Sequence, residues 1–272
     1  MIYKKFLIVL FFSLFFISCN NSTGPEPISN NFYPIALNQE WEYSTTDTIE
    51  YYDTLVNIKN TEVHNLGNTI VRIEALYDTS IEPSKDLIRF VSFEVGQSNL
   101  KAINWYENKN DGLYVVAYKP APSSQPKIQK LNSGGIYMNI DVLKRLNLFL
   151  DFNLYTKTIN NYTRVWVQPS KVLAYPIKVG NYWNDNNVPF YKNRFVETKE
   201  NININGNIYA VYKIASIGYN IDFRLNDFIS PKYGLVMREV LADSVVILAP
   251  NSDNILGFAK MKRISKLVRK SF

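Results

Sequence analysis

The sequence predicts a mainly β protein with an antiparallel sheet and one short helix, and three observations support this prediction. The 272-residue chain contains 19 tyrosines and 16 phenylalanines, and aromatic residues, like β-branched ones, fit the pleated surface of a sheet. Several segments alternate between polar and apolar residues with the period of two that is typical of strands. Asn-Gly and Asp-Gly pairs stand beside such segments, where a tight hairpin needs residues that tolerate positive φ angles.

Strands are expected along the first half of the chain. The clearest segments are 69–77 (TIVRIEALY) and 86–95 (DLIRFVSFEV), in which successive side chains point to opposite faces. Asp111-Gly112 predicts a hairpin between two further strands. Residues 119–135 contain three prolines and a Gly-Gly pair, so a long loop is expected there. The other expected strands lie at 41–43, 49–58, 100–106 and 113–118.

The second half contains the strongest hairpin signal. Residues 201–204 (NINI) alternate, and residues 207–214 return after Asn205-Gly206, a pair that suits a type I′ turn. Residues 140–152 have instead the spacing of an amphipathic helix, with Asp141 as its N-cap. Further strands are expected at 220–228, 235–241, 244–248 and 257–268.

The N-terminus has the organisation of an export signal. Lys4 and Lys5 give it a positive start, and residues 6–18 (FLIVLFFSLFFIS) form an uncharged apolar run. This run has the length of a signal-peptide core and is shorter than the about 20 apolar residues that span a bilayer as a helix. An ordinary signal peptide, a lipoprotein signal and a short transmembrane anchor are all compatible with these features.

The end of the apolar run favours the lipoprotein signal. Phe16-Ile17-Ser18-Cys19 resembles a bacterial lipobox, although leucine is commoner than phenylalanine at its first position. Cys19 is the only cysteine in the chain, so it can form no internal disulfide bond. The resemblance implies cleavage after Ser18 and fatty-acylated lipid on Cys19, and two or three acyl chains make such anchoring stable.

The chain divides into a signal peptide at 1–18, a lipidated tether at 19–30 and one β-rich domain at 31–272. The tether is polar and contains glycine and proline (NNSTGPEP at 20–27). Asn20 is not the aspartate that resembles an inner-membrane retention signal in enteric lipoproteins. We therefore expect a cell-envelope location, lipid-anchored in the outer membrane and facing the periplasm.

The charge of the chain is mildly basic. The formal net charge of +6 falls to +4 when Lys4 and Lys5 leave with the signal. This is too small to indicate nucleic acid as a partner, and an exported protein does not meet it. Residues 260–270 hold much of the excess charge. A solvated terminal strand explains them best, and contact with anionic head groups is the alternative.

One short pattern occurs twice in the sequence. Tyr33-Pro34-Ile35 is followed by Trp41, and Tyr175-Pro176-Ile177 is followed at the same distance by Trp183. Proline holds its own φ angle and favours an extended predecessor. Each copy is therefore expected to lead the chain into a strand, through a turn, with its tryptophan buried at the start of that strand.

Two explanations of the repeat stay open. The alignment also places Asn38 opposite Gly180, but the residues between the two copies match poorly. One local device used twice is the favoured explanation. A duplication with similar halves, at about 31–170 and 171–272, is the alternative.

These patterns carry a resemblance to known proteins over about residues 31–240. The two Tyr-Pro-Ile…Trp segments, DGLY at 111–114, the Gly206 hairpin and SPKYGLV at 230–236 look like a broad, mostly uncharacterised group of bacterial envelope proteins. That group is similar in pattern to the lipoprotein-carrier (LolA/LolB) type of fold. The resemblance implies a curved antiparallel sheet, or unclosed barrel, over an apolar concavity, and a hydrophobic ligand.

Catalytic chemistry finds little support in the sequence. His64 is the only histidine, lies in a turn-like stretch and is expected to be a surface loop residue. With Cys19 at the anchor, neither a nucleophile–histidine pair nor a metal centre of several His and Cys ligands is expected. Seven acids that could serve a carboxylate-based hydrolase have no telling spacing. They are Glu40, Glu42, Glu74, Glu94, Glu197, Asp222 and Asp227.

The four tryptophans are the candidate ligand-binding residues: Trp41, Trp105, Trp166 and Trp183. Each could line a cavity, although a strand tryptophan is more often part of the core. We therefore predict a non-enzymatic, membrane-anchored envelope lipoprotein without cofactor or metal that binds a hydrophobic small molecule or lipid. A structural or assembly lipoprotein that contacts an envelope protein is the alternative, and a carboxylate-based hydrolase is the third hypothesis.

Overall fold

A computed structural model gives the fold of the domain. It describes residues 32–52, 59–121, 127–130, 136–139, 156–159, 163–185, 192–218, 223–249 and 254–272. Cys19, the tether and Asp222 lie outside these ranges, as does the helix predicted at 140–152. The described residues form strands and their connections, without a helix.

Fifteen strands make up the described part of the chain. The first seven are β1 (Glu40–Tyr52), β2 (Lys59–Asp78), β3 (Leu87–Glu94), β4 (Ala102–Lys109), β5 (Gly112–Lys119), β6 (Lys127–Lys130) and β7 (Ile136–Asn139). The next four are β8 (Thr156–Ile159), β9 (Thr163–Ala174), β10 (Tyr182–Asp185) and β11 (Lys192–Ile204). The last four are β12 (Asn207–Gly218), β13 (Phe223–Ser230), β14 (Gly234–Leu248) and β15 (Ile255–Lys270).

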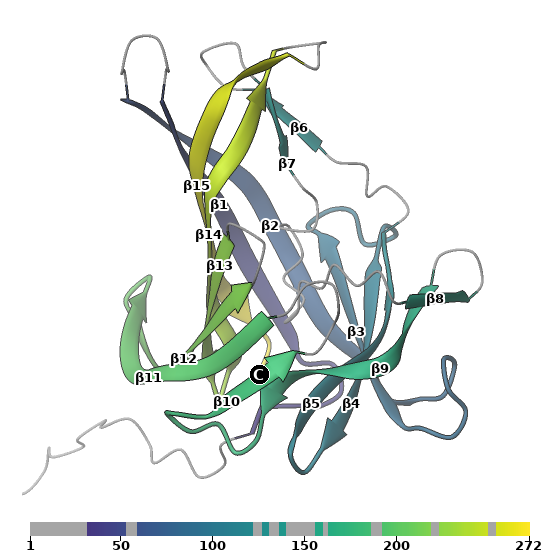
Figure 1. Ribbon diagram of the computed structural model, residues 1–272. Coiled ribbons are helices and arrows are strands. Elements are labelled where there is room, and N and C mark those ends of the chain that lie inside the picture. Colours follow the sequence, from purple (N-terminus) through teal and green to yellow (C-terminus); the bar gives the residue numbers. More distant parts are fainter. Residues whose placement is uncertain are drawn as a thin grey trace, which may run out of the picture.

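The strands form one antiparallel sheet that curves into a nearly closed barrel (Figure 1). Its main path runs β10-β11-β12-β13-β14-β15-β1-β2-β3-β4-β5-β9-β8. Strand β7 pairs with the far end of β14 and with β6. The path places the first and last strands of the domain side by side, and it leaves β9 and β10 together at an unpaired seam. The predicted antiparallel sheet and unclosed barrel are therefore confirmed.

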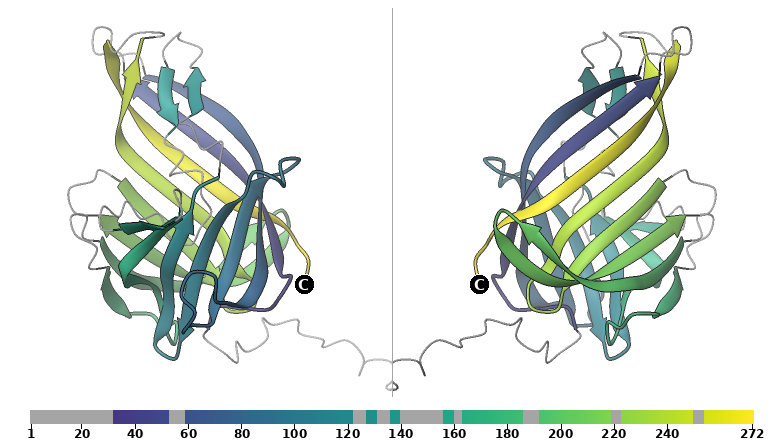
Figure 2. Two further views of the ribbon diagram at one scale, coloured as in Figure 1. Left: turned by 90° about the vertical axis from the view of Figure 1, so that its right-hand side faces the viewer. Right: turned by 90° about the vertical axis from the view of Figure 1, so that its left-hand side faces the viewer.

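The strands β14, β15, β1 and β2 are longer than most of the others and cross the barrel diagonally (Figure 2). Strand β1 pairs with β15 from Trp41↔Lys270 to Tyr52↔Phe258. It pairs with β2 on its other side from Glu40↔Arg72 onward. The β1–β15 ladder joins segments that are more than 200 residues apart in sequence, whereas the β1–β2 ladder joins neighbours along the chain.

The interior follows the alternation of the strands. Along β1, Trp41 and Tyr43 belong to the main apolar cluster, which gathers residues from both halves of the chain. Farther along, Ile49 belongs to a second, smaller cluster with Met261 and Ile247. Between these two clusters lie the inward-facing polar residues Thr45 and Asp47. The same side of the sheet thus changes from apolar to polar and back.

One local prediction is confirmed by the structure, and two loop predictions are wrong. Asn205 and Gly206 have φ angles of 52° and 85° between β11 and β12, which confirms the predicted turn. The prediction of an uninterrupted loop at 119–135 is wrong, because β6 lies within it. The loop assignment of His64 is also wrong, since this residue lies within β2, where Asp47 is its cross-strand partner on β1. The polar composition around it had suggested a turn.

Candidate functional site

The two repeated segments, residues 33–41 and 175–183, have the same local geometry, and we call them the lead-in segments. Asn38 and Gly180, opposite one another in the alignment, have positive φ angles of 64° and 88°. In each segment a turn is closed by a backbone hydrogen bond, from Gln39 N–H to Ala36 O and from Asn181 N–H to Lys178 O. The predicted turn before each strand is therefore confirmed.

The hydrogen bonds to the following strand also match. Asn38 N–H donates to Ile73 O, and Ile73 N–H donates to Gln39 O, both at 3.0 Å. In the second segment, Gly180 N–H donates to Val196 O at 3.0 Å, and Val196 N–H donates to Asn181 O at 2.9 Å. Each segment thus docks on the strand that follows its own, β2 in one case and β11 in the other. Whether the copies arose by duplication stays a prediction.

The lead-in segments also touch one another at the base of the barrel. Tyr33 N–H donates to the Tyr175 hydroxyl at 3.4 Å, and the rings of Phe32 and Tyr175 lie 4.8 Å apart. Burial raises the pKa of Tyr33 and of Tyr175 well above the usual range for tyrosine. Both hydroxyls therefore remain protonated in the folded protein at neutral pH.

The two segments differ in what closes the sheet beside them. Strand β1 is paired on both sides, whereas β10 is paired only with β11. On its other side β10 lies beside β9 (Figure 1), and side chains make the connection there. The Trp183 indole N–H donates to Lys171 O at 3.0 Å, and Arg194 Nη1 donates to Val172 O at 3.1 Å. We call this β9–β10/β11 contact the seam.

The barrel interior contains two bidentate ion pairs. Arg263 binds both carboxylate oxygens of Asp47 at 2.5 and 2.6 Å, and the side chains are at most 1% exposed. Arg238 binds both oxygens of Asp227 at 2.6 and 2.8 Å and is buried too. Paired geometry of this kind satisfies the charges that burial would otherwise leave unsolvated.

The ion pairs and their neighbours form what we call the polar band. The Thr45 and Ser265 hydroxyls, 2.9 Å apart, extend it between Asp47 and the main apolar cluster. Because the band faces the inside of the sheet, the interior is amphipathic. Sequence reasoning missed the band. Arg263 was counted among the solvated charges of residues 260–270, although buried positions alternate with exposed ones along β15.

The predicted tryptophan site is divided by the structure. Trp41 and Trp183 are both buried in the main apolar cluster. Trp105 belongs to a separate cluster with Leu87 and Val116, because it points to the opposite face of β4 from Tyr106. Trp166 lies on β9, and its side chain is outside the described part.

The described tryptophans all donate their indole N–H within the protein. Trp41 donates to Tyr233 O at 2.6 Å and stacks on Phe90. Trp105 donates to Asp78 Oδ2 at 3.0 Å. With the Trp183 bond at the seam, these contacts fit the core role, and ligand binding by the tryptophans stays a prediction.

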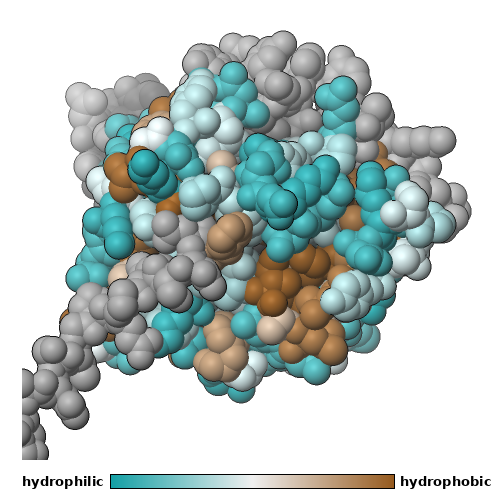
Figure 3. Space-filling view, turned by 90° about the horizontal axis from the view of Figure 1, so that it is seen from below, coloured by the Kyte–Doolittle hydropathy of each residue, from teal (hydrophilic) through white to brown (hydrophobic). Residues whose placement is uncertain are grey.

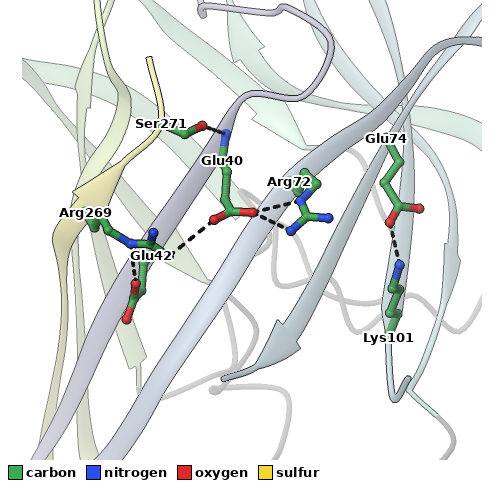
Figure 4. Close-up of polar contacts among 7 residues, drawn as sticks. All are labelled: Glu40, Glu42, Arg72, Glu74, Lys101, Arg269 and Ser271. Atoms are coloured by element: carbon green, nitrogen blue, oxygen red, sulfur yellow. Dashed lines mark hydrogen bonds and ion pairs between the residues drawn. The ribbon is translucent and has the colours of Figure 1, made fainter. Parts of the chain in front are cut away.

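Several of the candidate acids lie on the outer face of β1 and β2 (Figure 4). Glu40 pairs with Arg72 at 2.5 Å, Glu42 pairs with Arg269 at 2.8 Å, and Glu74 pairs with Lys101 at 2.5 Å. Hydrogen bonds from Asn68 and Arg269 lower the pKa of Glu42. A carboxyl group held as an anion in this way is poorly suited to donate a proton.

Metal and membrane chemistry find no further candidates in the described ranges. There, no group of three or more His, Cys, Asp or Glu side chains could hold a metal ion. Within the same ranges, no helix has the length and hydropathy to cross a bilayer.

Comparisons with known proteins add little to this picture. No protein-family profile matches the chain, and no curated protein matches it. A solved structure from Bacteroides fragilis, described as an exported protein with a YmcC-like fold, covers 89% of this chain and 100% of its own. Its sequence identity is 12% and the TM-score is 0.32. Values this low do not identify the family of the chain.

Proposed function

We propose that this chain is a lipid-anchored protein of the bacterial envelope whose barrel binds an apolar or amphipathic ligand without catalysing a reaction. The anchor is the lipid on Cys19, and the destination is the periplasmic face of the outer membrane. No cofactor or metal takes part. The observation that carries the binding role is the seam, where side chains replace a backbone ladder.

The seam supports ligand entry for a physical reason. A continuous ladder opens only when several backbone hydrogen bonds break together, whereas in the described residues side-chain bonds from Trp183 and Arg194 cross the seam. The neutral Trp183 bond contributes only about 0.5–1.5 kcal/mol net to stability, and the charge-assisted Arg194 bond about 1.5–3 kcal/mol. Opening at the seam therefore leaves the β1–β15 and β1–β2 ladders intact.

The interior supports a ligand with both apolar and polar parts. Barrels of eight strands are about filled by their own side chains, and this sheet has thirteen strands on its main path. The main apolar cluster and the polar band lie on the same inner face of the sheet, and this combination matches the chemistry of an acyl chain with a polar head.

Mass spectrometry tests the anchor and the ligand separately. The N-terminal peptide of the protein from its native membrane is expected to begin at Cys19 with lipid attached, and the Cys19→Ala variant is expected to leave the membrane fraction. An unmodified Cys19 would refute the anchor. Native mass spectrometry of the whole protein is expected to show an added mass that organic solvent extracts. No added mass, even after fatty acids or phospholipids are supplied, would refute the carrier role.

A second candidate function is assembly with an envelope protein. The end of the barrel around the start of β15 exposes Ile255, Leu256 and Phe258, with Val246 as the cross-strand neighbour of Phe258. Exposed apolar side chains that lie together often mark a contact surface. A photo-crosslinking residue at Phe258 is expected to capture one protein in stoichiometric amount if this function is correct. The same residue at Lys262, on the same outer face of β15, is the control.

A further inference from the structure

The base of the barrel exposes apolar side chains that the core does not use. Seen from below, brown apolar side chains form a patch among polar ones (Figure 3). We call Phe32 together with the exposed apolar residues of the lead-in segments and of the C-terminus the base patch. It consists of Phe32, Leu37, Val179, Tyr182 and Phe272.

Contacts within the base bring these separate stretches together. The Phe32 ring lies 4.8 Å from that of Tyr175, in the segment that carries Val179. The Phe272 ring lies 5.2 Å from that of Trp41, at the end of the segment that carries Leu37. The base patch is therefore one surface, built from the start, middle and end of the domain.

The stretches that carry the base patch are positively charged, and the neighbouring Asp111 is paired with Lys171. Stretches 32–39, 175–182, 231–233 and 270–272 of the base contain Lys178, Lys232 and Lys270 and no aspartate or glutamate. The Lys270 ammonium lies 4.4 Å from the centre of the Tyr233 ring, and that of Lys232 lies 5.4 Å from it. Lysines beside exposed aromatic and aliphatic side chains are the combination that binds anionic lipid surfaces.

The tether joins the domain next to the base patch. Phe32, the first described residue, belongs to the base patch, and only residues 20–31 separate it from Cys19. Twelve residues reach at most about 40 Å when fully extended and roughly 20 Å on average as a flexible chain. A lipid on Cys19 therefore holds the base close to the bilayer, and weak contacts suffice because the effective concentration is high.

We propose that the base patch docks on the surface of a bilayer that contains anionic phospholipid, so that the barrel stands on its base. This inference rests on the proposed lipid anchor at Cys19. The docked orientation turns the seam's lower end, next to Val179 and Tyr182, toward the membrane. An apolar ligand can then pass between bilayer and barrel without crossing water.

The lone cysteine makes the test simple. Because lipid occupies the thiol of Cys19 in the anchored protein, a cysteine introduced elsewhere is the only free thiol. Val179→Cys carries a fluorophore at the base, and Val63→Cys carries it elsewhere on an exposed strand position. Val63 pairs with Thr48, seven residues along β1 from Trp41, or roughly 23 Å from the base. The full-length proteins are reconstituted in vesicles of phosphatidylethanolamine and phosphatidylglycerol with nitroxide-labelled lipid.

The expected result is quenching of the fluorophore at position 179 that is several-fold stronger than at position 63. Lys178→Glu should weaken the quenching at 179, and Lys260→Glu, at an exposed position on β15, should not. Equal quenching at both positions would overturn the proposal. So would quenching at 179 that depends on protein density but not on anionic lipid, because that would indicate a second copy or another protein on the patch.

A protein without lipid on Cys19 would give a different result from a protein that is anchored but does not dock. The protein would not float with the vesicles, and the thiol of Cys19 would react with the fluorophore in the chain without an introduced cysteine. That result would remove both the anchor and the docking that depends on it. Flotation with a blocked Cys19 but without selective quenching would remove the docking alone.

Discussion

The two lead-in segments share a turn, a positive φ angle, a docking pattern and a buried tryptophan, yet they stand in different surroundings. The first leads into β1, which is paired with β2 and with β15. The second leads into β10, which is paired with β11 only and meets β9 through side chains. The same local structure therefore begins one strand in the middle of the sheet and another at its open edge.

This difference shows that closure of the barrel is not a local property. Trp41 and Trp183 each donate an indole N–H to a backbone carbonyl, of Tyr233 and Lys171 respectively. The bond of Trp41 strengthens a region that ladders already hold, whereas the bond of Trp183 is one of those that cross the seam. Mutations at the two matched positions should therefore affect different sets of strands.

The largest loss of stability is expected in the β1–β15 ladder. This ladder is the second pairing of β1, and β10 has no equivalent. Asp47→Ala removes one partner of a fully buried ion pair and leaves Arg263 uncompensated, which should lower the free energy of unfolding by about 3–5 kcal/mol. Arg269→Met, in the exposed pair with Glu42 on the same two strands, should change it by only about 0–1 kcal/mol. Denaturant unfolding measures both, and equal losses would contradict the burial of the pair.

Next in size is the loss of an indole donor. Trp183→Phe and Trp41→Phe each leave a carbonyl group without its donor, so each should lower stability by about 1–3 kcal/mol. Hydrogen exchange should separate them. Trp183→Phe should speed exchange in β9 and β10 alone, and Trp41→Phe should speed it throughout β1, β2 and β15. A global change in the Trp183→Phe variant would show that the seam does not open independently.

A smaller effect is expected at the two matched turns. Gly180 has a φ angle of 88° with open space where a Cβ would lie, so Gly180→Ala meets no clash, but alanine is strained at this positive φ angle. This should lower the free energy of unfolding by about 1–2 kcal/mol. Asn38→Gly should be tolerated, since asparagine already occupies a positive φ angle there. Thermal unfolding checks both, and a destabilised Asn38→Gly would show that the asparagine side chain has another role.

The last effect is absent at neutral pH and develops only at high pH. Burial raises the pKa of Tyr33 and Tyr175 above the value of about 10 in the unfolded chain. The stability that each contributes is thus complete below pH 10 and declines as the pH rises further, by about 1.4 kcal/mol per pH unit per tyrosine. Tyr175→Phe should make the decline shallower by that amount. Unfolding at pH 9 to 12 measures the slope, and an unchanged slope would mean that Tyr175 ionises while folded.

Local features of the fold could be predicted from local sequence. Alternation in residues 69–77 and 86–95 located β2 and β3, because a strand buries every second residue whatever it pairs with. The Asn205-Gly206 turn was predictable because few other residues accept two positive φ angles in succession. His64 was misplaced because the residues around it are mostly polar, as in a turn, whereas its side chain lies on the inner face of β2 beside Asp47.

The candidate site was less accessible to sequence reasoning. The tryptophans were recognised, but only the register of the strands divides Trp105 from Trp41. Asp47 and Arg263 are 216 positions apart in the chain, and nothing near either residue predicts the other. The base patch has the same origin, since Phe32, Val179 and Phe272 come from distant stretches.

The sequence by itself determined most of the strands, the turns, the repeated lead-in segments and the apolar run before Cys19, because these depend on neighbours along the chain. Only the tertiary structure decided which strand edges meet, which charges are buried and which apolar side chains remain exposed at the base. The physical reason is that a ladder or a buried ion pair requires two distant segments to close a long loop. Whether closure is favourable depends on the packing of the whole sheet, so β1 gained a second partner and β10 did not.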